Sequence, residues 1–483
     1  MTDSSTAPTD ASQAKPPKVV PHFTRAERAA RGKAARAEVP RSTQGEIDFP
    51  PHRDPIALLE EQAVSRVPEL VPIRYGRMLA SAFAFYRGGA LIMAEDLSRT
   101  PHSGLRVQLC GDAHLSNFGI FGSPERELVF DINDFDETAP GPWEWDLKRL
   151  AASFAIGSRE VGFSEKERRA VVLDTVRSYR ESMAAFASMR NLEVWYSHLR
   201  IEDALQTFAS GVDPRRLKQV EADIAKARTK DSMQAFEKLT HVVDGERRII
   251  SDPPLIVPID ELLPEGMERE AFENEFRTIV RSYRRTLETD RRHLLEGFRY
   301  VDIARKVVGV GSVGTRAWIG LFLGADDEDP LFLQMKEAQP SVLERFAGRS
   351  EYNNSGQRVV AGQRLMQATS DIFLGWQRIP AGLDGKQRDF YLRQLKDWKG
   401  SFAIEAAVPA GARAYGTMCG WTLARAHARS GDRIAIAAYL GKSDVFDQAI
   451  AAFAESYADQ NQRDYEALQE AVASGRLKAE IGV

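Results

Sequence analysis

The sequence predicts an α+β fold in which a mainly helical region comes first, a β-rich region follows, and further helices come last. Three observations give this order. Apolar residues recur at helical spacing from Trp145 to about Phe298. From Val301 they become β-branched and aromatic, in short runs separated by turns. After Tyr415 the helical spacing returns. A chain of 483 residues exceeds one small core, so several domain-sized units are expected.

The first 45 residues are predicted to form a disordered basic arm. They are rich in Ala, Ser, Thr, Pro, Lys and Arg, and they contain few large apolar residues that could build a core. The expected units are this arm (1–45), a helical lobe (46–300), a β-rich lobe (301–400) and C-terminal helices that pack on the helical lobe (401–483).

The composition is that of a soluble globular protein, with 43% apolar residues, 28% charged residues and a net charge of −4. This balance creates no basic field, so it gives no strong signal for nucleic-acid binding. No segment reaches about 18 consecutive apolar residues, so we expect no membrane span. The two cysteines cannot build a disulfide framework, and a cytoplasmic setting is expected. The sequence does not indicate an oligomeric state.

Helices and two short strands are expected before residue 300. Ser164, with Glu167 three residues later, is typical of a capping box at a helix start. The expected elements are helices over 74–97, from 164 toward 183 and over 268–298, and strands over 105–109 and 127–132.

The β-rich region is expected to open with a hairpin. Its two strands, over 307–323 and 330–338, are separated by an acidic turn that contains Gly324 and Pro330. The elements expected after it are a helix over 357–368, strands over 372–378 and 390–395, and helices after Tyr415.

A group of acids and amides follows the first two predicted strands. Asp112 and Asn117 lie on one loop, and Asp131, Asp134 and Asp136 come from the next hairpin. Phosphoryl transfer needs a carboxylate that accepts the hydroxyl proton, together with oxygen ligands for Mg²⁺. Asp112 is therefore the candidate base, and the other four are candidate metal ligands. A solvated turn without a ligand is the alternative.

A glycine-rich segment lies about 200 residues downstream. Gly309, Gly311 and Gly314 fit the pattern G-x-G-x-x-G, and Ser312 lies between them. A dinucleotide-binding fold needs a helix directly after the glycines, whereas residues 315–322 favour a strand. This context favours a strand–turn–strand loop over nucleotide phosphates, and a simple hairpin turn is the alternative.

Lys336 is the candidate phosphate-holding lysine. It lies at the end of an apolar strand, where an unpaired charge is costly to bury. Alternation puts Leu331, Leu333 and Met335 on the opposite face from Lys336. Glu337 and Glu344 are candidate partners, because the next predicted helix contains no acid and offers only Gln363.

These motifs resemble the catalytic segments of aminoglycoside and choline phosphotransferases. Gly111–Asn117 resembles their Gly-Asp-x-His-x-x-Asn loop, and Asn133–Asp136 resembles their metal-binding segment. Asp146 matches the Asp that braces the catalytic loop, whereas Cys110 replaces the usual His before Gly-Asp. The resemblance implies a protein-kinase-like two-lobed fold with ATP and Mg²⁺ as cofactors. It assigns Asp112 as base, Asn117 and Asp134 as Mg²⁺ ligands, and Asp146 as structural support. The other candidates for structural support are His114, Glu344 and Gln363.

The order of the motifs differs from that of ordinary kinases, since the catalytic loop precedes the glycine loop. A circular permutation accounts for this order. Trp421–Ser430 resembles the helix that precedes the catalytic loop in aminoglycoside-type kinases, and Arg74–Leu97 is the rival for that role. His427, within the first of these segments, is expected to be a packing residue. The motifs together also resemble an uncharacterised bacterial family, the domain of unknown function 2252, over roughly residues 45–470.

The sequence therefore predicts an ATP- and Mg²⁺-dependent phosphotransferase that acts on an unknown hydroxyl acceptor, either a small molecule or a protein. Nucleotidyl transfer (AMPylation) on the same fold, a nucleotide-binding pseudokinase and a metal-dependent phosphoesterase are the alternatives.

Overall fold

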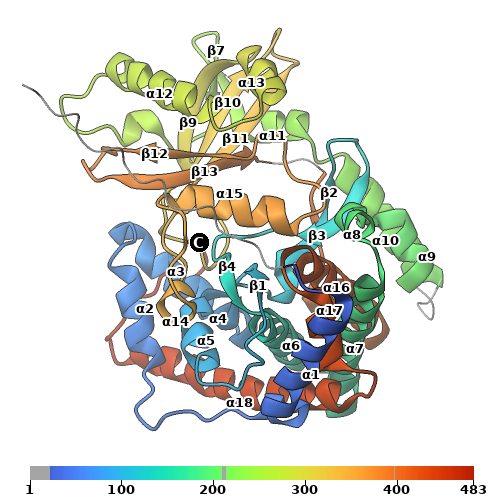
Figure 1. Cartoon of the computed structure of the whole chain (residues 1–483). Coiled ribbons are helices and arrows are strands. Elements are labelled where there is room, and N and C mark those ends of the chain that lie inside the picture. The colour runs from blue at the N-terminus through green and yellow to red at the C-terminus, as the bar shows by residue number, and fades with distance from the viewer. Residues whose placement is uncertain (1–21, 209–213, 396–397) are drawn as a thin grey trace, which may run out of the picture.

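The computed structural model describes residues 22–208, 214–395 and 398–483. Its strands form one six-stranded sheet, one four-stranded sheet and two two-stranded sheets, with antiparallel pairing throughout, and helices make up most of the rest. Figure 1 shows the large sheet and its helices at one end of the molecule and a packed group of helices at the other. The predicted mixed α+β class is confirmed.

The large sheet has the strand order β12-β13-β11-β10-β9-β8. On β11, Leu331, Leu333 and Met335 pack against residues of α12 (Arg269–Arg284) such as Phe276, as the alternation predicts. The opposite face, which carries Lys336, lies toward α15 (Figure 1). The elements are β8 (Ile256–Pro258), β9 (Arg299–Lys306), β10 (Ala317–Leu323), β11 (Pro330–Ala338), β12 (Gly375–Ile379), β13 (Arg388–Gln394) and α15 (Ser355–Met366).

The β-rich region begins earlier than predicted. The proposed boundary at residue 300 is wrong, because β8 belongs to the large sheet and α12 packs on it. The strands between residues 240 and 258 have only three or four residues each, too few to show the alternation that reveals a strand. The segment contains α11 (Ser232–Leu239), β6 (Thr240–Val243), β7 (Glu246–Ile249), α12 (Arg269–Arg284) and α13 (Thr289–Glu296), so the predicted single helix over 268–298 is two.

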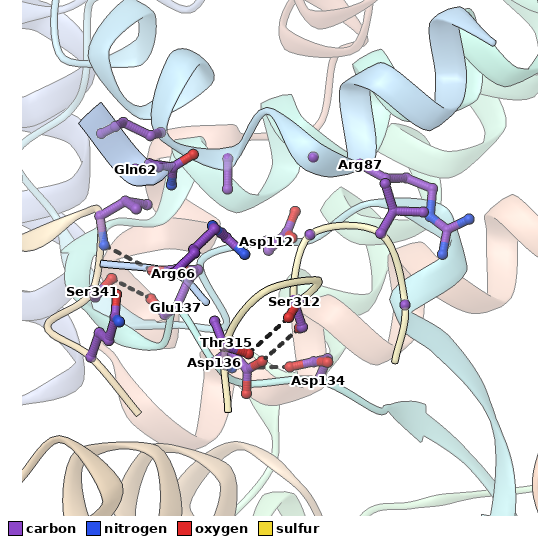
Figure 2. A pocket seen from close by; sticks show the side chains of 18 of the residues that line it. Gln62, Arg66, Arg87, Asp112, Asp134, Asp136, Glu137, Ser312, Thr315 and Ser341 are labelled. Carbon is purple, nitrogen blue, oxygen red and sulfur yellow. Dashed lines mark hydrogen bonds between the residues drawn. The ribbon is translucent and has the colours of Figure 1, made fainter. Parts of the chain in front are cut away.

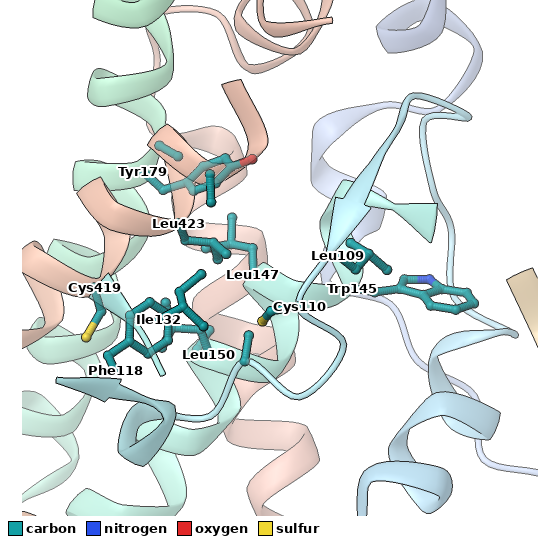
Figure 3. Packing of buried hydrophobic residues seen from close by; sticks show 14 of the residues in the cluster. Leu109, Cys110, Phe118, Ile132, Trp145, Leu147, Leu150, Tyr179, Cys419 and Leu423 are labelled. Atoms are coloured by element: carbon teal, nitrogen blue, oxygen red, sulfur yellow. The ribbon is translucent and has the colours of Figure 1, made fainter. Parts of the chain in front are cut away.

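The main core surrounds α6 (Trp143–Glu160). Figure 3 shows Leu147 and Leu150 of this helix beside Tyr179 and Leu423, which come from α7 and α16. The free thiols of Cys110 and Cys419 are both buried in this core. Its other helices are α7 (Glu165–Ser188), α16 (Pro409–Ser430), α17 (Arg433–Leu440) and α18 (Val445–Ala473).

The arm predicted to be disordered contains a helix, α1 (Arg25–Glu38). Thr24 and Glu27 form a capping box at its start. Its small residues permit close packing on α17, since a Cβ atom at Gly32 would lie 2.0 Å from the carbonyl oxygen of Ala435. The prediction of disorder is therefore wrong for α1, and residues 1–21 lie outside the described residues.

The helix predicted over 74–97 is broken into three. Ser81 caps the second piece by accepting from the Ala84 N–H at 3.0 Å, and Gly89 separates the second from the third. The pieces are α3 (Val71–Met78), α4 (Ala82–Gly88) and α5 (Ala90–Leu97). They follow α2 (Pro55–Ala63) and pack beside the glycine-rich segment.

The predicted strands at 105–109 and 127–132 are present as β1 and β3. The remaining elements are β1 (Arg106–Leu109), β2 (Phe118–Gly122), β3 (Leu128–Ile132), β4 (Ala139–Pro142), β5 (Leu199–Arg200), β14 (Gly400–Ser401), α8 (Asn191–Tyr196), α9 (Ile201–Phe208), α10 (Pro214–Arg228) and α14 (Glu344–Ala347). Within the described part of the chain, no helix has the length and apolar character needed to cross a bilayer.

Candidate functional site

A cavity of about 390 Å³ lies between the large sheet and the helical region. Its walls come from the loop after β1 (110–117), the acidic segment after β3 (133–137), the glycine-rich segment after β9 (309–314), and helices α2 to α5 (Figure 2). The predicted site residues on its wall are Asp112, His114, Asn117, Asp134, Asp136, Gly309, Gly311 and Ser312. Segments separated by about 200 residues in sequence thus meet at one cavity.

The loop after β1 is held in shape by Asp146. Its carboxylate accepts hydrogen bonds from the backbone N–H groups of Cys110 (2.8 Å) and Gly111 (3.0 Å). Gly111 has a φ of +85°, and a Cβ atom there would lie 2.2 Å from the carbonyl oxygen of Glu137. Only glycine fits this position, so the turn that presents Asp112 is determined locally.

His427 of α16 lies behind this loop rather than in the cavity. Its Nε2 is 3.2 Å from an Asp146 carboxylate oxygen, and its Nδ1 is 2.8 Å from the hydroxyl of Tyr179. Because the ring is fully buried, His427 supports Asp146 and is remote from any substrate.

Asp112 is paired with Arg149, a residue that sequence reasoning missed. The Arg149 Nε donates to Asp112 Oδ1 at 2.5 Å, and its guanidinium lies 4.4 Å from the ring centre of Tyr86. Burial alone would lower the pKa of Arg149, but the neighbouring Asp112 outweighs burial and raises it. A signal was available, because Arg149 follows Asp146 by three residues and faces the same side of the helix.

His114 also lies beside Asp112, with its Nε2 3.8 Å from Asp112 Oδ2. The ring is buried, and its Nδ1 has no hydrogen-bond partner among the described residues. Burial lowers the pKa of His114 to about 4, so the ring is neutral at pH 7.

Asn117 and Asp134 carry side-chain oxygen atoms that could coordinate a divalent cation. The Asn117 Nδ2 donates to the carbonyl oxygen of Asp112 at 2.7 Å, so the amide oxygen is the atom left to coordinate. Both side chains lie on the cavity wall. No group of three or more His, Cys, Asp or Glu side chains in the described ranges could hold a metal alone. Kinase-type Mg²⁺ needs only an Asp and an Asn, since phosphate oxygens supply other ligands, so these residues fit.

Asp131 is not part of this site. It is 3% exposed and is buried on the other side of β3, where Arg425 donates to its carboxylate and the Ala368 N–H donates at 3.2 Å. The prediction that Asp131 binds metal is therefore wrong. Successive side chains of a strand point to opposite faces, and that of Asp131 lies on the face away from the cavity.

Lys336 reaches the acidic segment from β11. Its Nζ lies 2.5 Å from Asp136 Oδ2 and 3.4 Å from Asp134 Oδ2, and the residue is 3% exposed. Burial alone would lower the pKa of Lys336, but the two carboxylates outweigh it and raise that pKa. Tyr391 completes the group by donating its hydroxyl to Asp136 Oδ1 at 2.5 Å.

The expected partners of Lys336 lie elsewhere. Glu337 accepts from the backbone N–H of Arg316, and Glu344 accepts from that of Ser341, each at 3.0 Å. Gln363 donates to Gln367 at 2.9 Å. On α15 the residue that faces the acidic segment is a cation, as Arg358 donates to the carbonyl oxygens of Thr138 and Asp136. Arg358 thus holds the backbone of the acidic segment, and the acids themselves pair with Lys336.

The glycine-rich segment is a strand–turn–strand loop between β9 and β10, and this excludes the dinucleotide-fold alternative. The predicted strand over 307–323 begins only at Ala317. Gly309 and Gly314 have φ values of +64° and +89°, which favour glycine. Ser312 donates to Asp136 at 3.3 Å (Figure 2). The loop is held from outside by Arg77, which donates to the Gly309 carbonyl at 2.6 Å.

The end of α16 lies against the start of β1. The Gln108 N–H donates to the Ser430 hydroxyl at 3.2 Å, and a Cβ atom at Gly431 would lie 2.4 Å from a methyl carbon of Val107. Arg74–Leu97, the rival for the helix before the catalytic loop, forms three helices at the cavity wall instead.

Comparison with known proteins identifies the family and nothing more specific. No curated protein matches the chain, and no solved structure matches it. Residues 66–471 match the family described as "Uncharacterized protein conserved in bacteria (DUF2252)". Because this match covers most of the chain, the protein belongs to the DUF2252 family of bacterial proteins.

Proposed function

We propose that this protein is an ATP- and Mg²⁺-dependent phosphotransferase that acts on a hydroxyl acceptor. The observation that carries the proposal is the contact of Lys336 with Asp134 and Asp136 at the cavity that also contains Asp112 and the glycine-rich loop. A base, two oxygen ligands, a lysine and a glycine loop are the parts that phosphoryl transfer requires. The cavity volume of about 390 Å³ lies within the usual range for small-ligand sites.

The proposal includes a circularly permuted, protein-kinase-like two-lobed fold. Starting from β9, the parts follow the kinase order: glycine loop, lysine strand, helix α15, strands β12 and β13, helix α16, catalytic loop and metal segment. The contact between Ser430 and Gln108 supports this reading, because it brings the end of α16 next to the strand that leads into the catalytic loop. Rejoining the chain there needs only a short link.

In the proposed mechanism each side chain has one task. Asp112 accepts the proton of the acceptor hydroxyl, and Arg149 holds the carboxylate in place through the 2.5 Å contact. Lys336 and the backbone N–H groups of the glycine loop position the phosphates. Asn117 and Asp134 would hold Mg²⁺, which neutralises charge on the phosphates when bound.

Two alternatives share parts of this site. Nucleotidyl transfer would use the same residues with a reversed nucleotide, and a pseudokinase would bind nucleotide without turnover. The phosphoesterase alternative is disfavoured, because it needs a cluster of acidic and histidine ligands and the described residues contain none. The water nucleophile of such phosphoesterases is also activated by bound metal ions.

Lys336→Ala is expected to weaken Mg-ATP binding by about tenfold or more, because it removes a buried charge-assisted contact to phosphate. Isothermal calorimetry measures this affinity. Lys386→Ala is the matched control, since Lys386 is an exposed lysine in a turn of the same region. Equal ATP affinity in the Lys336 variant and the control would reject the lysine's role.

The mass of the modified acceptor separates the two transfer reactions. With Mg-ATP and a pool of small hydroxyl compounds and proteins, phosphoryl transfer adds about 80 Da, whereas AMP transfer adds about 329 Da. We expect the smaller increment. ATP binding without any mass change would support the pseudokinase alternative.

A further inference from the structure

Three arginines form one wall of the cavity. Arg66 follows α2, Arg74 lies on α3 and Arg87 ends α4, and all three line the same space as Asp112. We call them the arginine cluster. Figure 2 shows Arg66 and Arg87 on either side of Asp112. Arg66 also donates to the Val313 carbonyl of the glycine-rich segment, so the cluster borders both that segment and Asp112.

The arginine cluster has unused hydrogen-bond donors. Arg74 is 0% exposed, and its Nη2 donates to Gln62 Oε1 and to the Gly88 carbonyl, each at 3.0 Å. Its Nη1 and Nε are buried without a partner, and so are the Nε atoms of Arg66 and Arg87, among the described residues. Buried polar atoms are normally hydrogen-bonded, and unpaired charged donors are costly. Since all three side chains line one cavity, they point to a ligand there that accepts hydrogen bonds.

Within the described residues, no carboxylate lies close enough to form an ion pair with any of the three guanidinium groups. Asp112 and Glu405 favour the charge of Arg87 only from a greater distance, as Glu137 and Glu337 do that of Arg66. The acids nearby are engaged: Asp112 with Arg149, and Glu137 with the Val342 N–H at 2.8 Å. Burial lowers the pKa of Arg66 to about 10, so this group remains charged at pH 7. An anion is the ligand that satisfies both the charge and the donors.

We propose that the arginine cluster binds an oxyanion of the acceptor, so that the acceptor is a small hydroxyl compound that carries a phosphate or a carboxylate. The planar guanidinium fork matches both oxyanions in a bidentate way. This inference rests on the proposed function, because Asp112 as base defines the acceptor side of the cavity. Binding of the anion there holds the hydroxyl next to Asp112.

The test measures oxyanion binding without turnover. Inorganic phosphate is titrated by calorimetry into the wild-type protein, Arg87→Gln, Lys336→Ala and the control Arg99→Gln. The control Arg99→Gln removes the same charge, but Arg99 is about half exposed and does not line the cavity. We expect about tenfold or greater weakening in Arg87→Gln and less than about twofold change in the other two variants.

The variants separate this inference from the proposed function. Phosphate affinity that is unchanged in Arg87→Gln, or absent from the wild-type protein, overturns the inference. Loss of phosphate affinity only in Lys336→Ala also overturns the inference, since the phosphate then occupies the proposed nucleotide site. That result leaves the phosphotransferase proposal intact. If Arg87→Gln does not fold, Arg66→Gln and the conservative Arg87→Lys take its place, with loss expected in the first and partial retention in the second.

A second titration distinguishes the two oxyanions. Malonate carries carboxylates, whereas phosphate carries phosphoryl oxygens. The probe whose affinity falls more strongly in Arg87→Gln shows whether the acceptor carries a carboxylate or a phosphate. If neither probe depends on Arg87, the inference is rejected.

Discussion

Asp112→Asn is expected to lower turnover by about 10²–10⁴, the usual range for a lost general base, and to leave Mg-ATP affinity within about twofold. The amide cannot accept the hydroxyl proton. It keeps an oxygen that can accept the Arg149 hydrogen bond, which measures 2.5 Å to Asp112, so the loop retains its support. Initial rates and calorimetric ATP titrations measure the two quantities separately.

The control for this variant is Asp459→Asn, which makes the same chemical change at a site far from the cavity. Asp459 is 59% exposed and pairs with Arg159 on the helical surface. Its turnover should equal that of the wild-type protein. If Asp112→Asn turns over at the control rate, Asp112 is not the base.

Arg425→Met is expected to reduce the free energy of unfolding by about 3–5 kcal/mol, because it leaves the carboxylate of Asp131 buried without its cation. The two side chains are 1% and 4% exposed, and the same guanidinium also donates to the Met366 carbonyl at 2.7 Å. Urea unfolding followed by circular dichroism gives the change in free energy.

A double-mutant cycle tests the physical reason for that loss. Asp131→Asn together with Arg425→Met removes both charges, so the double variant should be more stable than Arg425→Met alone. A loss of unfolding free energy below about 1 kcal/mol in Arg425→Met would show that the ion pair between Asp131 and Arg425 is exposed to water.

Local patterns predicted the parts of the fold that depend on neighbouring residues. The Ser164 and Glu167 capping box opens α7, and the strands around Asp112 and Lys336 lie where alternation places them. Asp146 contacts the loop after β1 because it lies in the first turn of the next helix, close to that loop. The residues that line the cavity from the acidic and glycine segments also belong to short, recognisable motifs.

The sequence could not reveal partners that are distant along the chain. Glu337 or Glu344, both close in sequence, was expected to pair with Lys336, yet Asp136 does so from 200 residues away. Asp131 looked like another member of the acidic group, and only its partner Arg425 shows that it is structural. The basic wall of the cavity was missed as well, because Arg66, Arg74 and Arg87 lie on three separate segments without a shared motif.

The long sequence separation of paired residues has a consequence for protein synthesis. Asp131 is made 294 residues before its partner Arg425. The ribosome adds about 5–20 residues per second, so roughly 15–60 s pass between the synthesis of Asp131 and that of Arg425. Lys336 and α16 have not yet been synthesised when Asp131 leaves the ribosome, so the acidic segment must remain hydrated until they are. The complete cavity therefore forms only late in translation, and contacts across such long separations favour slow folding.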